Sequence, residues 1–250
     1  MSLLGVQRRG SGPPLVWLHG FTQTKDSAHQ FRSILAGTNE LLTLDLPGHG
    51  ENAAIQASLD ETAELLAEVL PVGPFTLGGY SFGARVSLHF ALHFPTRVHA
   101  LVLLGASRGI DDPAAREERR RSDEALAERI ETIGSDAFLD EWLAREMFAS
   151  LPDDPLERTA RSRDAVGLAG SLRHAGTGTQ RWLAPLLGSL VMPTLAMAGA
   201  RDEKFSREAS AIAEGVLNGT AEFVLDAHHA AHLEQPQRSA TLVQEFTRRL

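Results

Sequence analysis

The nine residues GGYSFGARV, at positions 78–86, place Ser81 between Gly79 and Gly83. An apolar run ends just before them, and a helical pattern begins at Phe82. A serine in a tight strand-to-helix turn needs glycines at these positions, because larger side chains would clash there. Such a turn lifts the hydroxyl above the sheet and beside a helix N-terminus, where free N–H groups favour negative charge. We therefore interpret Ser81 as a reactive serine rather than an idle residue of a glycine-rich loop.

Short apolar runs alternate with helical patterns along most of the chain. Runs without polar alternation are typical of strands that are buried on both faces of a parallel sheet. We expect strands within 14–20, 41–50, 75–81, 98–107, 193–202 and 221–229, and helices near 58–70, 82–94, 206–217 and 236–249. This alternation predicts an α/β fold with a doubly wound, mostly parallel sheet. Ligands of such sheets bind outside the carboxyl ends of the strands.

One segment, 108–185, lacks the strand pattern. The stretches PAAREERRRSDEALAERIETIG (113–134) and DAFLDEWLAREMFASL (136–151) have helical spacing and helix-forming residues. DDP at 111–113 and LPDDP at 151–155 are typical of turns that begin helices. We expect a helical lid at 108–185, inserted between the core segments 1–107 and 186–250.

Composition restricts the chemistry and the partners of the protein. The 250 residues carry a net charge of −8, which argues against nucleic acid as the main partner. The chain has no cysteine, which excludes disulfides, thiolate catalysis and cysteine-ligated metal. The first ten residues lack the apolar stretch of a secretion signal, and no apolar run reaches the roughly 18 residues that cross a membrane. We expect a cytoplasmic protein without membrane insertion; its oligomeric state is not indicated.

A reactive serine needs a histidine that accepts its proton, and the histidine needs a carboxylate that orients it. Asp202 ends the predicted strand in TLAMAGARD, and His229 follows the predicted strand in AEFVLDAHH. Both are expected at the sheet edge that carries Ser81, in the chain order of a strand-to-helix serine site. The neighbouring residues that could fill the same roles are Asp226, His228 and His232.

Two backbone N–H groups are needed to hold the negative oxygen that forms when such a site reacts. We expect one from Phe82, directly after Ser81, and the other from Phe21 in the loop HGF, 19–21. We interpret His19 of the same loop as a structural residue.

Arg85 follows Ser81 by four residues, so it lies one turn further along the same face of the predicted helix. Its guanidinium would place a fixed positive charge near the reacting centre, and the planar fork suits a carboxylate. An ion pair with an acidic residue of the fold is the alternative for Arg85. The expected partner is a small anionic substrate that carries carboxylates.

The motifs LHGF, LDLPGHG, GYSFG and GARD, followed by the terminal histidine segment, resemble the α/β-hydrolase superfamily over essentially the whole chain. Longer stretches resemble one family within it, the 2-succinyl-6-hydroxy-2,4-cyclohexadiene-1-carboxylate synthases of menaquinone biosynthesis. These stretches are GYSFGARV, REERRRSD, EWLAREMFASL, GARDEKF and HHAAHLEQP. A match in the lid is the more discriminating part, since most hydrolases specify that region poorly.

The resemblance implies a lyase that eliminates pyruvate from 2-succinyl-5-enolpyruvyl-6-hydroxy-3-cyclohexene-1-carboxylate, with no metal or organic cofactor. It gives Ser81 the role of a basic oxygen, served by Asp202 and His229. The substrate-binding residues that it implies are Arg85, Arg121, Arg161 and Trp142. Two departures from the family pattern are His228, where a glycine usually precedes the catalytic histidine, and GHGEN at 48–52 in place of GHGxS.

Other interpretations stay open at this point. The same triad serves serine esterases and carbon–carbon bond hydrolases, and a binding protein could keep the pocket without turnover. Arg121 and Arg161 could belong to solvated faces of the lid. Trp142 could be an apolar anchor of the lid on the core.

Overall fold

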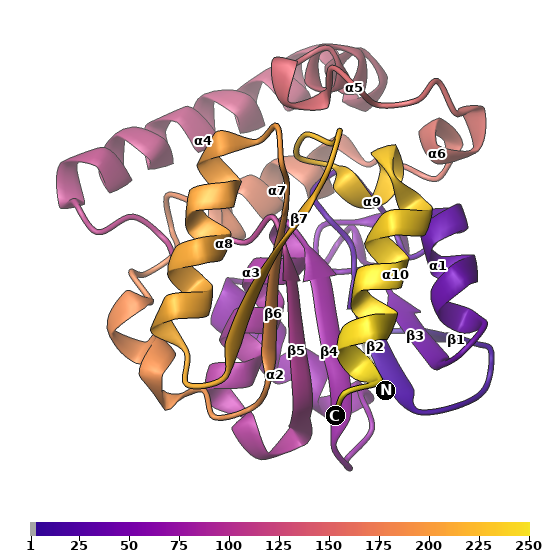
Figure 1. Ribbon diagram of the computed structural model, residues 1–250. Coiled ribbons are helices and arrows are strands. Elements are labelled where there is room, and N and C mark those ends of the chain that lie inside the picture. The colour runs from indigo at the N-terminus through magenta and orange to yellow at the C-terminus, as the bar shows by residue number, and fades with distance from the viewer. Residues whose placement is uncertain (1–3) are drawn as a thin grey trace.

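The computed structural model describes residues 4–250 (Figure 1), so residues 1–3 of the first predicted core segment lie outside the described residues. The described chain forms a seven-stranded sheet of order β1-β3-β2-β4-β5-β6-β7. β1 pairs antiparallel with β3, and the other neighbours pair in parallel. The strands are β1 Val6–Arg9, β2 Pro14–Leu18, β3 Glu40–Leu44, β4 Phe75–Tyr80, β5 Val98–Leu104, β6 Thr194–Gly199 and β7 Gly219–Val224. The predicted α/β class with a doubly wound, mostly parallel sheet is confirmed.

The central strand β5 shows why these strands appear as uninterrupted apolar runs. Leu101 and Leu103 belong to one buried core cluster, whereas Val102 and Leu104 belong to another. Alternate side chains of a strand point to opposite faces of the sheet, so both faces must be covered by helices. The cluster on the Leu101 and Leu103 face includes residues of α2 Leu59–Val69, α3 Phe82–His93 and α8 Glu203–Gly215. The cluster on the opposite face includes residues of α1 His29–Ala36 and α10 Pro236–Thr247.

Helix boundaries follow local capping where the sequence supplies a cap. Ser58 and Glu61 form a reciprocal capping box at the start of α2. Helix α8 begins earlier than expected because the Asp202 carboxylate accepts a hydrogen bond from the Phe205 amide at 3.1 Å. Sequence reasoning missed β1, α1 and the short α9, Ala231–Glu234. The α1 start carries no signal: Ala28 precedes it with a left-handed φ of 58° and no side-chain cap.

The segment between β5 and β6 lies above the carboxyl ends of the strands (Figure 1). Its helices are α4 Pro113–Ile133, α5 Ser135–Leu143, α6 Pro155–Thr159 and α7 Ala165–Ala175. Asp112 and Asp154 cap α4 and α6, each with a proline in the first turn, as DDP and LPDDP predict. A small apolar cluster that includes Ile130 and Leu168 joins α4 to α7. We call residues 108–185 the lid.

The remaining regular segments are short 3₁₀ turns at Gly50–Asn52, Pro95–Arg97, Glu146–Phe148 and Ala184–Ser189. Within residues 4–250, no helix is both long and apolar enough to span a membrane.

Candidate active site

The strand-to-helix turn holds Ser81 in a strained backbone conformation. Ser81 has φ 51° and ψ −103°, ends β4 and directly precedes α3. A Cβ added to Gly79 would lie 2.5 Å from the Gly83 carbonyl carbon, and one added to Gly83 would lie 2.3 Å from the Leu18 oxygen. The turn therefore excludes side chains at both glycines, and the surrounding backbone fixes a conformation that serine would not otherwise adopt.

His229 links Ser81 to Asp202 by two hydrogen bonds. Its Nε2 lies 3.0 Å from Ser81 Oγ, and its Nδ1 lies 3.0 Å from Asp202 Oδ2. The carboxylate can only accept, so Nδ1 carries the hydrogen and Nε2 is free to take the serine proton. Burial raises the pKa of Asp202, but the hydrogen bond and charge interaction with His229 outweigh it, so the pKa falls below its ordinary value. Asp202 is thus an anion that can stabilise a protonated His229.

The other candidates for the acid and the histidine, Asp226, His228 and His232, contact other residues. Asp226 is exposed, and its carboxylate pairs with Arg201 at 2.6 Å. The His228 ring hydrogen-bonds with Ser150 Oγ at 2.8 Å, so this departure from the family pattern points away from Ser81. His232 is buried with its ring 4.2 Å from that of Tyr80. The structure brings Ser81, Asp202 and His229 together and leaves the alternatives outside the set.

The two residues expected to form the oxyanion hole both lie on the cavity above Ser81. The Ser81 amide cannot serve an oxyanion, because it already donates a hydrogen bond to the Leu104 carbonyl at 2.8 Å. Among the described residues, neither the Phe21 amide nor the Phe82 amide donates to a backbone carbonyl in the turns, loops and helix caps. Free N–H groups on either side of the serine are what an oxyanion hole requires, so these two residues remain the prediction.

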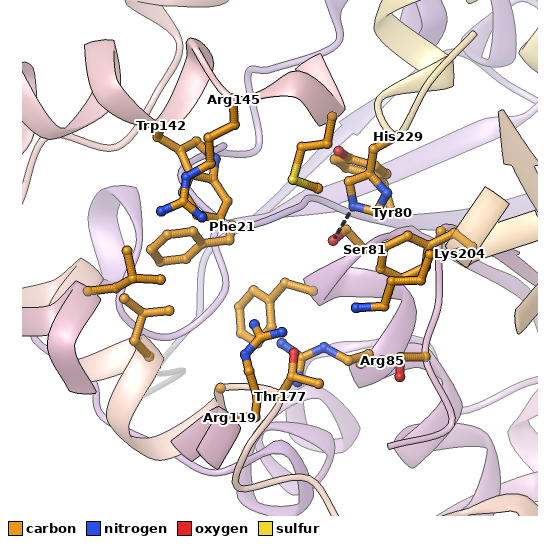
Figure 2. A pocket seen from close by; sticks show the side chains of 18 of the residues that line it. Phe21, Tyr80, Ser81, Arg85, Arg119, Trp142, Arg145, Thr177, Lys204 and His229 are labelled. Atoms are coloured by element: carbon orange, nitrogen blue, oxygen red, sulfur yellow. Dashed lines mark hydrogen bonds between the residues drawn. The ribbon is translucent and has the colours of Figure 1, made fainter. Parts of the chain in front are cut away.

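The cavity has a volume of about 440 Å³ and opens between the sheet edge and the lid (Figure 2). Trp142 lines it and also packs on Phe21 and Phe138, with ring centroids 5.3 and 5.8 Å away. The indole therefore anchors the lid and faces the cavity at the same time. Its Nε1 is buried without a hydrogen-bond partner among the described residues, which leaves a donor available to a ligand.

Four cationic side chains line this cavity, and Asp202 is the acid among its lining residues in the described chain. Arg85 is buried, and donates to the Ala175 carbonyl at 2.9 Å. Burial lowers its pKa to about 10, so it stays charged at neutral pH. Within residues 4–250 no carboxylate forms an ion pair with it, contrary to the alternative of a structural salt bridge. The other three cations are Arg119, Arg145 and Lys204 (Figure 2).

The structure corrects the predicted position of two lid arginines. Arg121 does not line the cavity; its side chain is 68% exposed and pairs with Glu118 on the same helix. Arg119 reaches the cavity instead, because positions two residues apart on a helix face in different directions. Arg161 is buried but is also absent from the cavity lining, and it donates to Thr22 Oγ1 at 2.7 Å.

Sequence reasoning missed Arg119, Arg145 and Lys204. The spacing of Arg119 and Asp123, which form an ion pair at 2.7 Å, was the available signal for the inner face of α4. Arg145 and Lys204 lie in EWLAREMFASL and GARDEKF, two stretches that carry the family resemblance, but no local spacing marks either residue as part of the cavity. Among the described residues, no group of three or more histidine, aspartate and glutamate side chains is arranged to hold a metal ion.

Comparison with known proteins agrees with the fold. Residues 13–236 match the family described as alpha/beta hydrolase fold. The chain belongs to the α/β-hydrolase family. A 2-succinyl-6-hydroxy-2,4-cyclohexadiene-1-carboxylate synthase from Serratia proteamaculans is 30% identical, over 96% of this chain and 95% of the relative. The predicted resemblance is therefore confirmed at the level of the family.

Two solved structures are similar to this chain over nearly their whole length. MenH from S. aureus has a TM-score of 0.91 and 28% identity, covering 100% of this chain and 99% of that chain. A thermophilic esterase from Thermogutta terrifontis, solved with malate bound, has a TM-score of 0.83 and 26% identity, covering 98% and 93%. One α/β-hydrolase scaffold thus carries both a protein named MenH and an esterase.

The hydrogen bonds of His229 predict different effects for two neighbouring acids. Asp202→Asn should lower kcat by on the order of 10³- to 10⁴-fold for any substrate processed at Ser81, because the amide orients the wrong imidazole tautomer. Asp226→Asn, the matched control, should leave kcat nearly unchanged. Steady-state kinetics on both folded variants measures this difference. A larger loss in Asp226→Asn would show that the orienting acid is misassigned.

Proposed function

We propose that this protein is a lyase that releases pyruvate from 2-succinyl-5-enolpyruvyl-6-hydroxy-3-cyclohexene-1-carboxylate, a reaction of menaquinone biosynthesis. The observation that carries the proposal is the cluster of positive charge above Ser81, in a chain whose net charge is −8. The proposed substrate carries three carboxylates, on its succinyl, ring and enolpyruvyl groups.

Of the four cationic side chains, Arg119 pairs with Asp123 at 2.7 Å, whereas Arg85, Arg145 and Lys204 form no ion pair with a described carboxylate. Arg145 lies with its guanidinium 4.4 Å from the centre of the Trp142 ring, and Lys204 Nζ lies 5.2 Å from that of Phe205. Neither forms an ion pair with a described residue. Partial burial lowers the pKa of Lys204, and the positive charge of Arg119 lowers it further. Cations that repel one another across a cavity are stabilised when an anionic ligand enters.

The names of the relatives support the choice of substrate. The Serratia protein is named for 2-succinyl-6-hydroxy-2,4-cyclohexadiene-1-carboxylate, the compound that remains after pyruvate leaves. Its similarity extends over nearly the whole chain, including the lid. The lid residues that line the cavity here include Arg119, Trp142 and Arg145.

The proposed reaction uses the triad as a base. Ser81 gives its proton to His229 Nε2, and Asp202 stabilises the imidazolium. The serine oxygen takes a proton from a ring carbon, the electron pair of that C–H bond passes into the ring, and the C–O bond to the enolpyruvyl group breaks. Negative charge that develops on oxygen is stabilised by the amides of Phe21 and Phe82. The proton held by the triad is returned to the departing enolpyruvate, so pyruvate leaves and the enzyme regains its starting state.

Ester hydrolysis is the second candidate function. The Thermogutta esterase shares the scaffold at 26% identity and was solved with a dicarboxylate, malate. Hydrolysis would use the same serine as a nucleophile and the same oxyanion hole. An esterase for neutral esters would gain little from four cationic side chains, and this favours the lyase.

The two functions are separated by one pair of assays on the purified protein. The enolpyruvyl substrate, made in situ, is added and pyruvate release is followed; a short-chain nitrophenyl ester is tested in parallel. We expect fast pyruvate release and slow ester cleavage, with both abolished in Ser81→Ala. Fast ester cleavage without pyruvate release would select the esterase and reject the lyase.

Lys204 gives a sharper test of the anionic substrate, because no described hydrogen bond ties its side chain to the fold. A hydrogen bond to a charged group contributes roughly 1.5–3 kcal/mol, and each 1.4 kcal/mol is about tenfold. Lys204→Met should therefore lower kcat/KM for the anionic substrate by about 10- to 150-fold and change cleavage of a neutral ester much less. Arg207→Met, at an exposed position on the same helix, is the control. Equal losses on both substrates would remove Lys204 from anion binding.

A further inference from the structure

Thr22, the residue after Phe21, is held at all three of its polar groups. Its amide donates to His49 Nε2 at 3.3 Å, its carbonyl accepts from the Ser162 amide at 2.8 Å, and its Oγ1 accepts from Arg161 at 2.7 Å. Thr22 is fully buried and has a left-handed φ of 67°. A β-branched residue is strained in that conformation, so its surroundings must hold it there.

His49 contacts both residues of the expected oxyanion hole. Its ring stacks on Phe82 with centroids 5.5 Å apart and meets Phe21 edge-on at 5.7 Å. His49 Nδ1 donates to the Pro47 carbonyl at 3.0 Å, which leaves Nε2 unprotonated to accept from Thr22. Burial lowers the pKa of His49 to about 3, so the ring keeps this neutral form at physiological pH.

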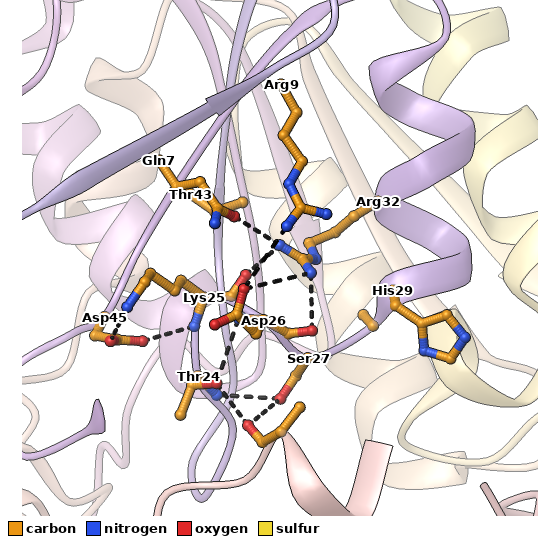
Figure 3. Close-up of polar contacts among 12 residues, drawn as sticks. Gln7, Arg9, Thr24, Lys25, Asp26, Ser27, His29, Arg32, Thr43 and Asp45 are labelled. Carbon is orange, nitrogen blue, oxygen red and sulfur yellow. Dashed lines mark hydrogen bonds and ion pairs between the residues drawn. The ribbon is translucent and has the colours of Figure 1, made fainter. Parts of the chain in front are cut away.

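A short piece of the lid, residues 160–162, is bonded along the loop that carries Thr22. The Ala160 carbonyl accepts from Thr24 Oγ1 at 2.5 Å and from Ser27 Oγ at 3.1 Å (Figure 3). The same loop is held from the core side by Arg32 and by Asp45, which accepts from the Lys25 amide (Figure 3). The loop is therefore fixed between the lid and the core.

We propose that Arg161 and His49 are positioning residues: through Thr22 they aim the Phe21 amide at the oxygen that becomes negative during the reaction. Arg161 then acts on the loop and not on a substrate carboxylate. This assigns to the lid a part in assembling the oxyanion hole, in addition to lining the cavity. The inference depends on the proposed function only through that hole, which elimination and ester hydrolysis both need.

A double-mutant cycle on Arg161 and Thr22 tests the proposal. Arg161→Met and Thr22→Val each remove one side of the same hydrogen bond, and valine keeps the shape of threonine. Each variant should lower kcat by roughly 10- to 100-fold with KM nearly unchanged, since a misplacement of about 1 Å costs up to about 100-fold. The double variant should lose no more than the larger single loss. A raised KM with unchanged kcat in Arg161→Met, or losses that multiply, would show that Arg161 binds substrate instead.

Two further variants distinguish a positioning role of Arg161 from a loss of folding. Arg161→Lys keeps a donor for Thr22 and should recover part of the lost kcat. Arg163→Met, at a lid arginine that pairs with Asp136 on the surface, should change neither constant. The cycle is run on pyruvate release or, if the wild-type protein cleaves only the ester, on ester hydrolysis. Failure of the lyase assignment is thus seen in the wild-type protein alone, separately from failure of the positioning role of Arg161.

Amide hydrogen exchange gives a measurement that needs no activity. His49→Phe keeps the ring contacts but removes the acceptor, so the Thr22 amide should exchange faster than in the wild-type protein. The Leu46 amide, which donates to His19 Nε2 at 3.0 Å, is the internal control and should be unchanged. Unchanged exchange at Thr22 would overturn the role assigned to His49.

Discussion

The backbone of Ser81 is the constraint on which the rest of the site depends. A serine held at φ 51° requires glycine at positions 79 and 83, a strand beneath the turn and a helix that begins at once. The parallel sheet supplies the strand and the register, because β2 runs beside β4 and brings Leu18 within contact of the turn. Once the serine is fixed at the carboxyl edge, loops from β6 and β7 bring Asp202 and His229 to the same edge. The positions of Ser81, Asp202 and His229 thus depend on several strands of the sheet and not on β4 alone.

The lid adds positive charge to the cavity above this centre and contacts the loop beside it. Its inner face carries Arg119 and, past the end of α5, Arg145, which face Lys204 and Arg85 from the core. Its more distal residues, 160–162, bind the loop that carries Phe21 and Thr22. In the proposed function, different parts of one inserted segment would recognise the anion and position the loop of the oxyanion hole. In a lyase, binding energy from the carboxylates can hold the reacting carbon against the serine oxygen.

Local patterns predicted the buried strands and the glycine-flanked serine, because both are determined by residues that are neighbours in sequence. The misses have equally specific causes. β1 is a short edge strand that ends in two arginines, and α1 begins without a capping side chain. The family resemblance implied Arg121, but Arg119 lines the cavity, and a run of three arginines does not by itself reveal which one faces inward. The place of Arg161 depends on contact with Thr22, 139 residues away along the chain, which no local pattern encodes.

Proton removal from carbon separates a lyase from an esterase built on the same triad, and a kinetic isotope effect measures it directly. The substrate is prepared with deuterium on the ring carbon from which Ser81 takes the proton, and kcat/KM for pyruvate release is compared with that of the unlabelled substrate. If the serine oxygen removes this proton in the step that limits kcat/KM, the deuterated substrate reacts several-fold more slowly. Equal values of kcat/KM for the two substrates would contradict Ser81 as the base in that step.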